Sequence, residues 1–429
     1  MKALTGILIV VLSILLIGTV FAGGAQEESK IGELTCWTWT FKCIDEWLVP
    51  AFNKIYPDIK IETVPMSHSD THDKAFVAIA TGSGAPDFLT IDSAYIQKFI
   101  DQAGLSAMTD FVKPIKKDFP AYKVANDSDL EGRIWAVPFD CGPVGLYYRN
   151  DIFSKFGISS PETWDEYIAT GKKLMDQGVY ITSVSVAAKA MDQTLHGEAG
   201  LHGLLTQQQA GSYFDAKLKP TLDTSESVRA MKLIKRMVDE GIAANVAQGS
   251  PAQYSLFDEG KLATIVSAAW YVNVLYNYVS KDSPAFGNWR VALLPAFDKG
   301  GRRASNLGGS ECAIPKQTSE AKRELAMKFI EYACTTIEGK EVHASYGEFP
   351  AYLPSYSTSV VQEKTFDMFG PQKVYKLFAE IAPNVPTNWR IPPAYTEIQR
   401  ILQAKMNAIL TGAVSVEEGL KEAQKEASL

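Results

Sequence analysis

Cysteine is scarce in this chain of 429 residues, which contains only five cysteines, and none of them forms a Cys-x-x-Cys pair. This density is far below that of small domains that depend on disulfides for their stability. In an exported protein, an odd number leaves at least one thiol free or pairs it with another chain. The number is compatible with one disulfide, whose partners the sequence does not identify.

Positive charge is also limited, since 42 Lys and Arg stand against 49 Asp and Glu and give a net charge of −7. No strongly basic stretch is present, and a basic patch is the usual electrostatic signature of a nucleic-acid-binding surface. The charge balance therefore argues against nucleic acid as a partner.

Long hydrophobic runs are absent beyond the N-terminus. Lys2 precedes a nearly unbroken apolar run from Ile7 to Val20, and small residues at Val20 and Ala22 suit a cleavage site. The run is short for a membrane-spanning helix, which needs about 20 residues. We predict a signal peptide over residues 1–22, cleaved after Ala22, and a flexible lead-in over 23–29. An uncleaved anchor is the alternative. The expected product is soluble, monomeric and periplasmic.

Metal and phosphate motifs are lacking as well. His68 and His72 are four residues apart, a spacing that suits metal ligation on a helix, but no third ligand is evident in the sequence. The glycines around Ser83 lack the Lys-Ser/Thr of a phosphate-binding loop and are better explained as a helix stop. Arg302 and Arg303 fit a solvated loop better than an anion site. We expect neither a metal nor a cofactor.

Apolar residues make up 46% of the chain and charged residues 21%, which is typical of globular proteins. The length exceeds the roughly 250–300 residues at which one core stops growing, so two domains are expected. Strands predicted over 34–39, 59–64 and 87–91 alternate with helices. This alternation indicates an α/β fold with mostly parallel sheets.

Two glycine-rich segments interrupt this pattern, Gly132–Asp151 and Leu307–Pro315. Each fits a place where the chain crosses from one domain to another. Gly142, Pro143 and Gly145 are candidate hinge residues by type. Cys141 and Cys312 fall on the two crossings, so they are expected to lie close together, and a disulfide between them would restrain domain motion.

Ligands of parallel sheets usually bind at the loops that follow the strands. This rule selects Trp39 and Thr40, Asp92 and Ser93, Asp140 at the first crossing, and Trp270 with Tyr271. Tryptophan rings suit stacking against sugar C–H faces, and planar polar groups suit hydroxyls. Alternatives remain for two of them, because Trp39 fits core packing equally well and Asp92 fits a helix N-cap.

Several motifs resemble a known family. One motif consists of Phe257-Asp-Glu-Gly-Lys-Leu-Ala followed by Ala268-Ala-Trp. It is similar to the Phe-x-x-Gly-Lys-x-Ala…Gly-x-Trp signature of extracellular solute-binding proteins of ABC importers, family 1. This family is the carbohydrate-binding group that includes maltose-binding protein. Ala268 stands where that signature has glycine. Agreeing segments, in order along the mature chain, begin at Ala80, Gly132, Tyr147, Val291 and Gly308.

The resemblance implies a periplasmic-binding-protein type II-like fold of two lobes with a ligand cleft between them. Lobe 1 would comprise 30–140 and 307–345, and lobe 2 would comprise 141–306 and 346–429, with crossings near 140–145 and 306–313. The resemblance adds to the candidate ligand residues Ser67, His68, Ser310, Glu311, Trp389 and Arg390.

The implied function is non-catalytic binding of a mono- or oligosaccharide and its delivery to the transmembrane permease subunits. Two alternatives stay open from the sequence. One is a different small solute, such as a polyol or a polyamine. The other is a secreted glycosidase with paired carboxylates drawn from Asp92, Asp140 and Glu311.

Overall fold

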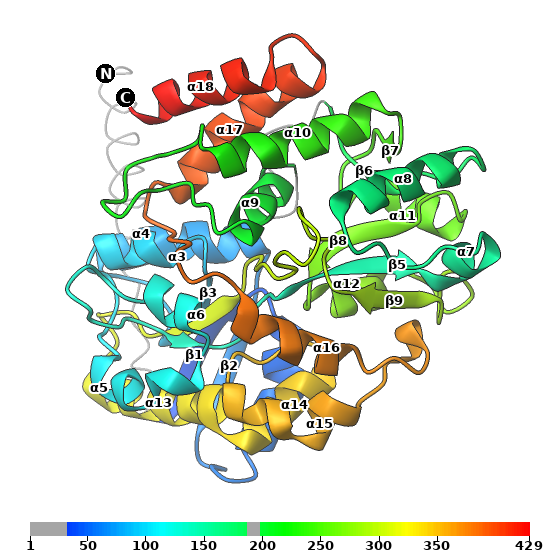
Figure 1. Cartoon of the computed structure of the whole chain (residues 1–429). Helices are drawn as coiled ribbons and strands as arrows, with labels where there is room; N and C mark the ends of the chain where they lie inside the picture. The colour runs from blue at the N-terminus through cyan, green and yellow to red at the C-terminus, as the bar shows by residue number, and fades with distance from the viewer. Residues whose placement is uncertain (1–31, 187–197) are drawn as a thin grey trace, which may run out of the picture.

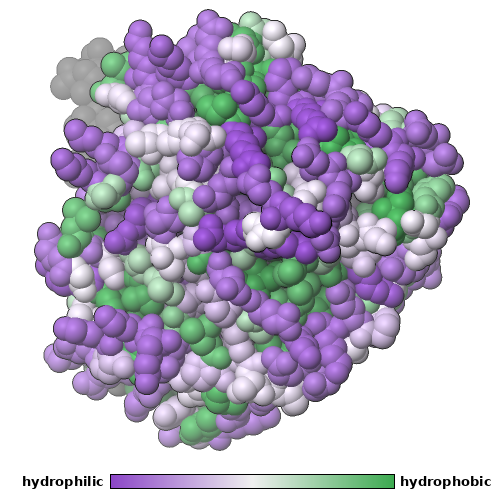
Figure 2. Space-filling model, viewed as in Figure 1, coloured by the Kyte–Doolittle hydropathy of each residue, from purple (hydrophilic) through white to green (hydrophobic). Residues whose placement is uncertain are grey.

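The computed structural model describes residues 32–186 and 198–429. The predicted signal peptide and lead-in lie outside these residues. Within the described ranges, none of the helices combines the length and apolar character needed to cross a membrane. Figure 2 shows a face that is mostly hydrophilic, with apolar patches separated from one another.

A five-stranded sheet forms one half of the molecule, in the order β2-β1-β3-β10-β4. Its strands are β1 (Glu33–Thr38), β2 (Lys60–Pro65), β3 (Phe88–Asp92), β4 (Val137–Pro138) and β10 (Ser310–Ala313). Neighbours β2, β1 and β3 run parallel, whereas β10 runs antiparallel to both β3 and β4.

A three-stranded sheet forms the other half, in the order β8-β5-β9, and a two-stranded parallel sheet joins β6 to β7. The strands are β5 (Val144–Arg149), β6 (Thr182–Ser183), β7 (Ala243–Ala244), β8 (Thr264–Ala268) and β9 (Trp289–Ala292). Residues along β5 alternate between two apolar cores, since Leu146 packs in one and Tyr147 in the other.

The mostly parallel arrangement expected for each sheet is not what the three-stranded sheet shows, because β5 is antiparallel to both β8 and β9. The reason is where the chain changes sheet. β5 and β10 are each the first strand after a crossing, and each enters its new sheet against the direction of its neighbours. Apart from β5 and β10, the strands of each of these two sheets run in one direction, as the strand–helix alternation predicts.

Helices cover both sheets (Figure 1). The helices that precede β9 in the sequence are α2 (Val49–Phe52), α3 (His68–Thr81), α4 (Ile96–Asp101), α5 (Thr109–Val112), α6 (Ala121–Asn126), α7 (Asn150–Lys155), α8 (Trp164–Met175), α9 (Glu198–Gln208), α10 (Ser225–Asp239), α11 (Pro251–Asp258) and α12 (Tyr271–Tyr278). Later ones are α13 (Glu320–Thr335), α14 (Ile337–Tyr346), α15 (Ser359–Glu363), α16 (Val374–Ile381), α17 (Tyr395–Leu410) and α18 (Val416–Ala427). Short π and 3₁₀ segments are η1 (Cys43–Leu48), η2 (Lys113–Asp118), η3 (Leu353–Ser357), η4 (Asp367–Phe369) and η5 (Ala382–Asn384).

The C-terminal third of the chain divides between the two halves. α14 packs on η1 and α13, beside the five-stranded sheet, whereas α16 packs on β5 and β9. α17 and α18 pack against each other and against α9 and α10, at the top of Figure 1. Segments far apart in sequence therefore contribute to each half.

Three local sequence patterns can be compared with the structure. The sequence pattern predicts a helix over 74–80, but α3 begins at His68, because the Ser67 hydroxyl accepts a hydrogen bond from Asp70 N (3.1 Å) and caps the helix. The β-branched residues over 180–186 predict a strand, of which the structure keeps the two residues of β6. Thr163 and Glu166 have the spacing of a capping box, and this prediction is confirmed at the start of α8.

All five cysteines are buried and free. The disulfide considered between Cys141 and Cys312 is therefore wrong. The Cys141 sulfur instead lies 3.4 Å from the Tyr356 hydroxyl, and Cys312 faces Cys334. Placement on neighbouring crossings does not direct the two side chains at one another.

Candidate functional site

The two crossings lie side by side and are joined by main-chain hydrogen bonds. Val144 N donates to Ser305 O (2.9 Å), and Leu307 N donates to Gly142 O (2.8 Å). A Cβ atom at residue 142 would lie 2.1 Å from the Leu307 carbonyl oxygen, so this approach requires glycine. The two crossings thus form one paired ribbon between the sheets.

Asn306 fastens this ribbon to its surroundings. Its Oδ1 accepts hydrogen bonds from Gly142 N (3.1 Å) and from the Tyr122 hydroxyl (2.8 Å). A third segment runs beside the first crossing, where Cys141 N donates to Phe349 O (3.2 Å). Residues from three distant parts of the chain therefore meet here.

A cleft of about 560 Å³ opens at this meeting point. It lies where β1, β3 and β8 end, as the rule for parallel strands predicts. Its lining comprises Trp39, Thr40, Phe41, Lys42, His68, Asp92, Asp140, Trp270, Asn273, Val274, Asn277, Leu307, Gly308, Gly309, Ser310, Tyr346 and Glu348.

The cleft wall beside the five-stranded sheet carries a carboxylate, Asp92, that is paired with His68. Asp92, at the end of β3, lies 3.3 Å from His68 Nε2. Burial alone would raise the pKa of Asp92, but the hydrogen bond and charge of His68 outweigh it and hold this pKa below its usual value. The Trp39 ring packs edge-on against His68, with centroids 5.0 Å apart. Asp92 is therefore an ionised acceptor at the cleft.

His72 lies behind this wall and is buried. Its Nε2 accepts a hydrogen bond from Asp92 N (2.8 Å), and its Nδ1 lies 2.7 Å from His68 O. Burial, with the nearby His68, lowers the pKa of His72 to about 4. Because both ring nitrogens are engaged, His68 and His72 do not form the metal pair that their spacing suggests.

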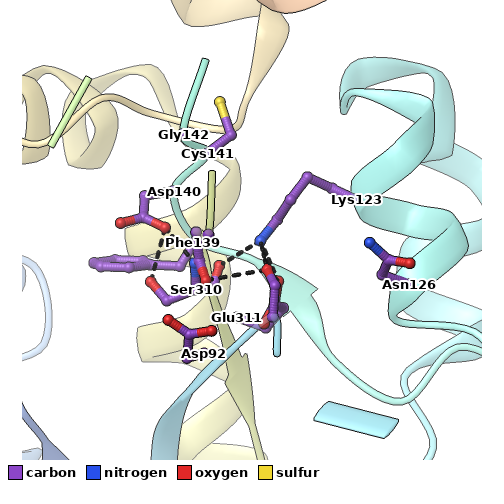
Figure 3. Close-up of polar contacts among 12 residues, drawn as sticks. Asp92, Lys123, Asn126, Phe139, Asp140, Cys141, Gly142, Ser310 and Glu311 are labelled. Atoms are coloured by element: carbon purple, nitrogen blue, oxygen red, sulfur yellow. Dashed lines mark hydrogen bonds and ion pairs between the residues drawn. The ribbon is translucent and has the colours of Figure 1, made fainter. Parts of the chain in front are cut away.

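Asp140 connects the first crossing to the second. Its Oδ1 accepts hydrogen bonds from the Ser310 hydroxyl (2.9 Å) and from Ser310 N (Figure 3). Burial raises the pKa of Asp140, against the opposing effect of Lys123 and Ser310. The Asp140 carboxylate thus lines the cleft from a fixed position. Figure 3 shows it close to Ser310, with Asp92 nearby.

Lys123 projects from α6 into the space behind Ser310 and is fully buried (Figure 3). It forms an ion pair with Glu311 and donates to Ser93 Oγ (2.8 Å) and Ser310 O (3.2 Å). Burial raises the pKa of Glu311 to about 7, although Lys123 acts in the opposite direction. This cluster supports the cleft wall from behind.

The opposite wall comes from the end of β8 and from α12. Trp270 precedes α12, is half-buried, and donates from Nε1 to Leu307 O (3.1 Å). Asn273, Val274 and Asn277 follow on the same helix and line the same cleft. Their three- and four-residue spacing places them on one helix face with Trp270. This wall offers an aromatic ring and amide groups without charge.

The structure brings together in this cleft many of the residues that the sequence singles out, namely Trp39, Thr40, His68, Asp92, Asp140, Trp270 and Ser310. The others lie elsewhere: Ser67 caps α3, Ser93 and Glu311 face Lys123, Tyr271 packs on Tyr147, Trp389 packs between Tyr213 and Tyr395, and Arg390 donates to Ala125 O. Ligand contact by any of them stays a prediction.

Sequence reasoning missed part of the lining. Asn273 and Asn277 were detectable, since polar residues four apart on a helix that starts next to Trp270 share its face. Lys42 follows the same strand end as Thr40. Tyr346 and Glu348 gave no signal, because they reach the cleft from a segment some three hundred positions beyond β1.

Known proteins resemble this chain along most of its length. A family profile described as bacterial extracellular solute-binding protein matches residues 44–336. The arabinooligosaccharide-binding protein of Bacillus subtilis (strain 168) is 26% identical over 380 residues, which cover 85% of this chain and 84% of that protein. The lactose-binding protein of Rhizobium radiobacter is 25% identical over 413 residues, with 92% of each covered.

Solved structures share the fold. The ABC-transporter-associated binding protein of B. animalis subsp. lactis, in complex with β-1,6-galactobiose, superposes with a TM-score of 0.75 at 25% identity, covering 92% of this chain and 97% of that one. The maltose-bound MalE3 of T. maritima gives 0.74 at 24% identity, covering 92% and 98%. The two-lobe α/β fold is confirmed by these likenesses. With the profile matching well over half its length, the chain belongs to the bacterial extracellular solute-binding proteins.

Proposed function

We propose that this protein binds a carbohydrate in the cleft and serves as the solute-binding component of an ABC importer. The observation that carries the proposal is the pairing of walls: the half-buried Trp270 on one side and the carboxylates of Asp92 and Asp140 on the other. An aromatic ring suits the C–H face of a sugar, and carboxylates accept hydrogen bonds from its hydroxyls. The names of the oligosaccharide- and lactose-binding relatives support the same class of solute.

The dimensions agree with such a ligand. A cleft of about 560 Å³ falls within the roughly 300–1,000 Å³ typical of small-molecule sites. Each buried polar group left unpaired costs about 1–3 kcal/mol, so a solute without matching hydroxyls is disfavoured. Lys42, Asn273 and Asn277 supply further polar groups in the lining.

The crossings are the proposed hinge. Lobe 1 is assigned to 30–140 and 307–345, and lobe 2 to 141–306 and 346–429, each with its own sheet. A ligand closes such lobes only through its higher affinity for the closed state. Residues 1–22 would be removed as a signal peptide during export. The closed monomer would then deliver its bound solute to the permease.

The cleft favours binding over catalysis. A glycosidase needs two carboxyl groups facing the scissile bond, one of them free to transfer a proton. Here Glu311 is ion-paired with Lys123 outside the cleft, and Asp140 is held by Ser310. Asp92 is held by His68. Each of the three carboxylates that the sequence suggested is thus already hydrogen-bonded or ion-paired to a neighbouring side chain.

The test is a thermal-shift screen of the purified mature protein against mono- and oligosaccharides, polyols and polyamines, followed by calorimetry and small-angle scattering on any hit. A cognate sugar at 100 times its Kd should add about 2.7 kcal/mol of stability. The radius of gyration should fall on binding. A shift with a polyamine alone, or release of reducing sugar from the ligand, would contradict the proposal.

A further inference from the structure

Glu348 connects the cleft to a buried cluster behind it. Cys43 begins η1, His343 lies in the last turn of α14, and Glu348 follows that helix. All three side chains are buried, with exposures of 0%, 0% and 6%. One potential ligand atom from each residue lies within 4.8 Å of the other two. This cluster plays no part in the solute contacts proposed above, apart from the surface that Glu348 presents to the cleft.

We propose that Cys43, His343 and Glu348 form a zinc site beside the solute cleft. A thiolate, an imidazole and a carboxylate are the donor types that Zn²⁺ takes in proteins. His343 Nε2 and Glu348 Oε2 are 3.0 Å apart, close enough for both to reach one ion. Three protein ligands leave a fourth position of the tetrahedron for water or for an oxygen of the solute.

The elements around the cluster make the arrangement stiff. η1 and α14 pack directly against each other, and α14 also packs on α13 and α2. Gly347, with φ of +126°, turns the chain between α14 and Glu348, a conformation that favours glycine. The ligands therefore come from packed elements, as a preorganised metal site requires.

The local charges define which neighbour resists the ion. The two negative charges of a Cys43 thiolate and the Glu348 carboxylate balance the double positive charge of a divalent cation. The positive charge of Lys340 opposes a bound cation, since its Nζ lies 3.3 Å from His343 Nδ1. The negative charge of Asp140, which acts on Lys340 and Glu348, favours the cation. Lys340 also donates to Phe139 O (2.7 Å), a bond that it can keep when the imidazole proton moves to Nδ1.

The experiment uses Co²⁺ as a spectroscopic stand-in on the chelator-treated mature protein, in the absence of sugar. One equivalent should give thiolate-to-cobalt charge-transfer absorption together with tetrahedral d–d bands, and Zn²⁺ should displace it. Cys43→Ser should abolish the charge-transfer band. Cys36→Ser is the matched control, because Cys36 is equally buried but lies outside the cluster, and it should leave the band intact.

Two further variants keep the test decisive if Cys43→Ser does not fold. Glu348→Gln should weaken cobalt affinity at least tenfold, and Lys340→Met should tighten it, because the opposing charge is gone. No charge-transfer band in the wild-type protein, or an unchanged band in Cys43→Ser, overturns the proposal. Because the readout needs no sugar, failure here leaves the proposed carbohydrate function intact, and failure to bind sugar leaves the zinc site intact.

Discussion

The two walls of the cleft differ in how they are built. The wall beside the five-stranded sheet carries every charged group of the lining, Lys42, Asp92, Asp140 and Glu348, and the imidazole of His68. The wall from α12 carries Trp270, two asparagines and a valine. One wall consists of strand ends and loops supported by buried ion pairs, and the other is one face of a single helix.

The difference teaches that the walls have separate tasks. A charged wall fixes the direction of ligand hydroxyls, but its groups must be held against the cost of burial by partners such as Lys123 and His72. An aromatic wall supplies contact area, and the Trp270 hydrogen bond to Leu307 O helps to anchor it. Changes to the first should therefore affect stability and pH response as well as affinity, and changes to the second should affect mainly affinity.

The largest expected effect comes from removing the support of the charged wall. Lys123→Met leaves Glu311 buried without its cation, and we expect it to destabilise the fold by about 3–5 kcal/mol in urea unfolding. Lys232→Met is the control, since Lys232 is in an exposed pair with Glu417 and should cost less than about 1 kcal/mol. Equal effects of the two substitutions would remove the structural role assigned to Lys123.

Acid should weaken the same wall through His72. Its folded pKa of about 4 lies below the ordinary 6.5, so its contribution is complete above pH 6.5 and is lost as the pH falls toward 4. That loss amounts to roughly 3 kcal/mol for such a histidine.

Urea unfolding at several pH values between 7 and 4 measures this loss. His72→Gln should flatten the stability profile in that window. His202 gives a comparison away from the charged wall, because burial lowers its pKa to about 4 as well. His202→Gln should remove a similar part of the acid-induced loss of stability. If the stability of His72→Gln fell with pH as steeply as that of the wild type, the role assigned to His72 would be wrong.

The aromatic wall should respond mainly in affinity. Trp270→Ala removes the stacking surface, and we expect the Kd for the cognate sugar to rise by roughly 10- to 100-fold, about 1.4–2.7 kcal/mol, while the protein still folds. Calorimetry measures it, and Trp47→Ala, at an exposed tryptophan outside the cleft, is the control. An unchanged Kd would remove Trp270 from the site.

The smallest effect compares single polar groups on the two walls. Asp92→Asn keeps an oxygen that can accept the hydrogen bond which Ala94 N donates to the carboxylate (2.8 Å), but it removes the charge. We expect about a tenfold loss of affinity for Asp92→Asn and about a threefold loss for Asn277→Ala, in line with charged and neutral hydrogen bonds. The reverse order, measured by calorimetry with one sugar, would show that charge does not distinguish the walls.

Much of the fold follows from local patterns. The apolar alternation over β1 and β2, the capping box at Thr163 and the glycines of the first crossing all act within a few residues, so the sequence predicts them. Strand direction in the three-stranded sheet does not follow, because it depends on how β5 enters after the crossing. No short-range pattern encodes that geometry.

The site divides in the same way. Trp39, Asp92 and Trp270 stand at or just after the ends of β1, β3 and β8, where a general rule finds them. Glu311 resisted prediction because alternation along β10 turns it away from the cleft, one position after Ser310, and toward Lys123 of α6. Glu348 resisted it because only the tertiary fold brings it to the cleft.

The hydrogen bonds between Gly142 and Leu307 have a mechanical consequence. Separate connections between the proposed lobes would allow bending, shearing and sliding as independent movements. Here the two crossings are bonded edge to edge at Val144 and Leu307, and the segment at Phe349, after the chain would cross a third time, is bonded to the first crossing through Cys141 N. A slip of one connection past another would break these bonds. If the lobes move as proposed, we expect a rotation that all the connections share, and a single ligand can then set its end point.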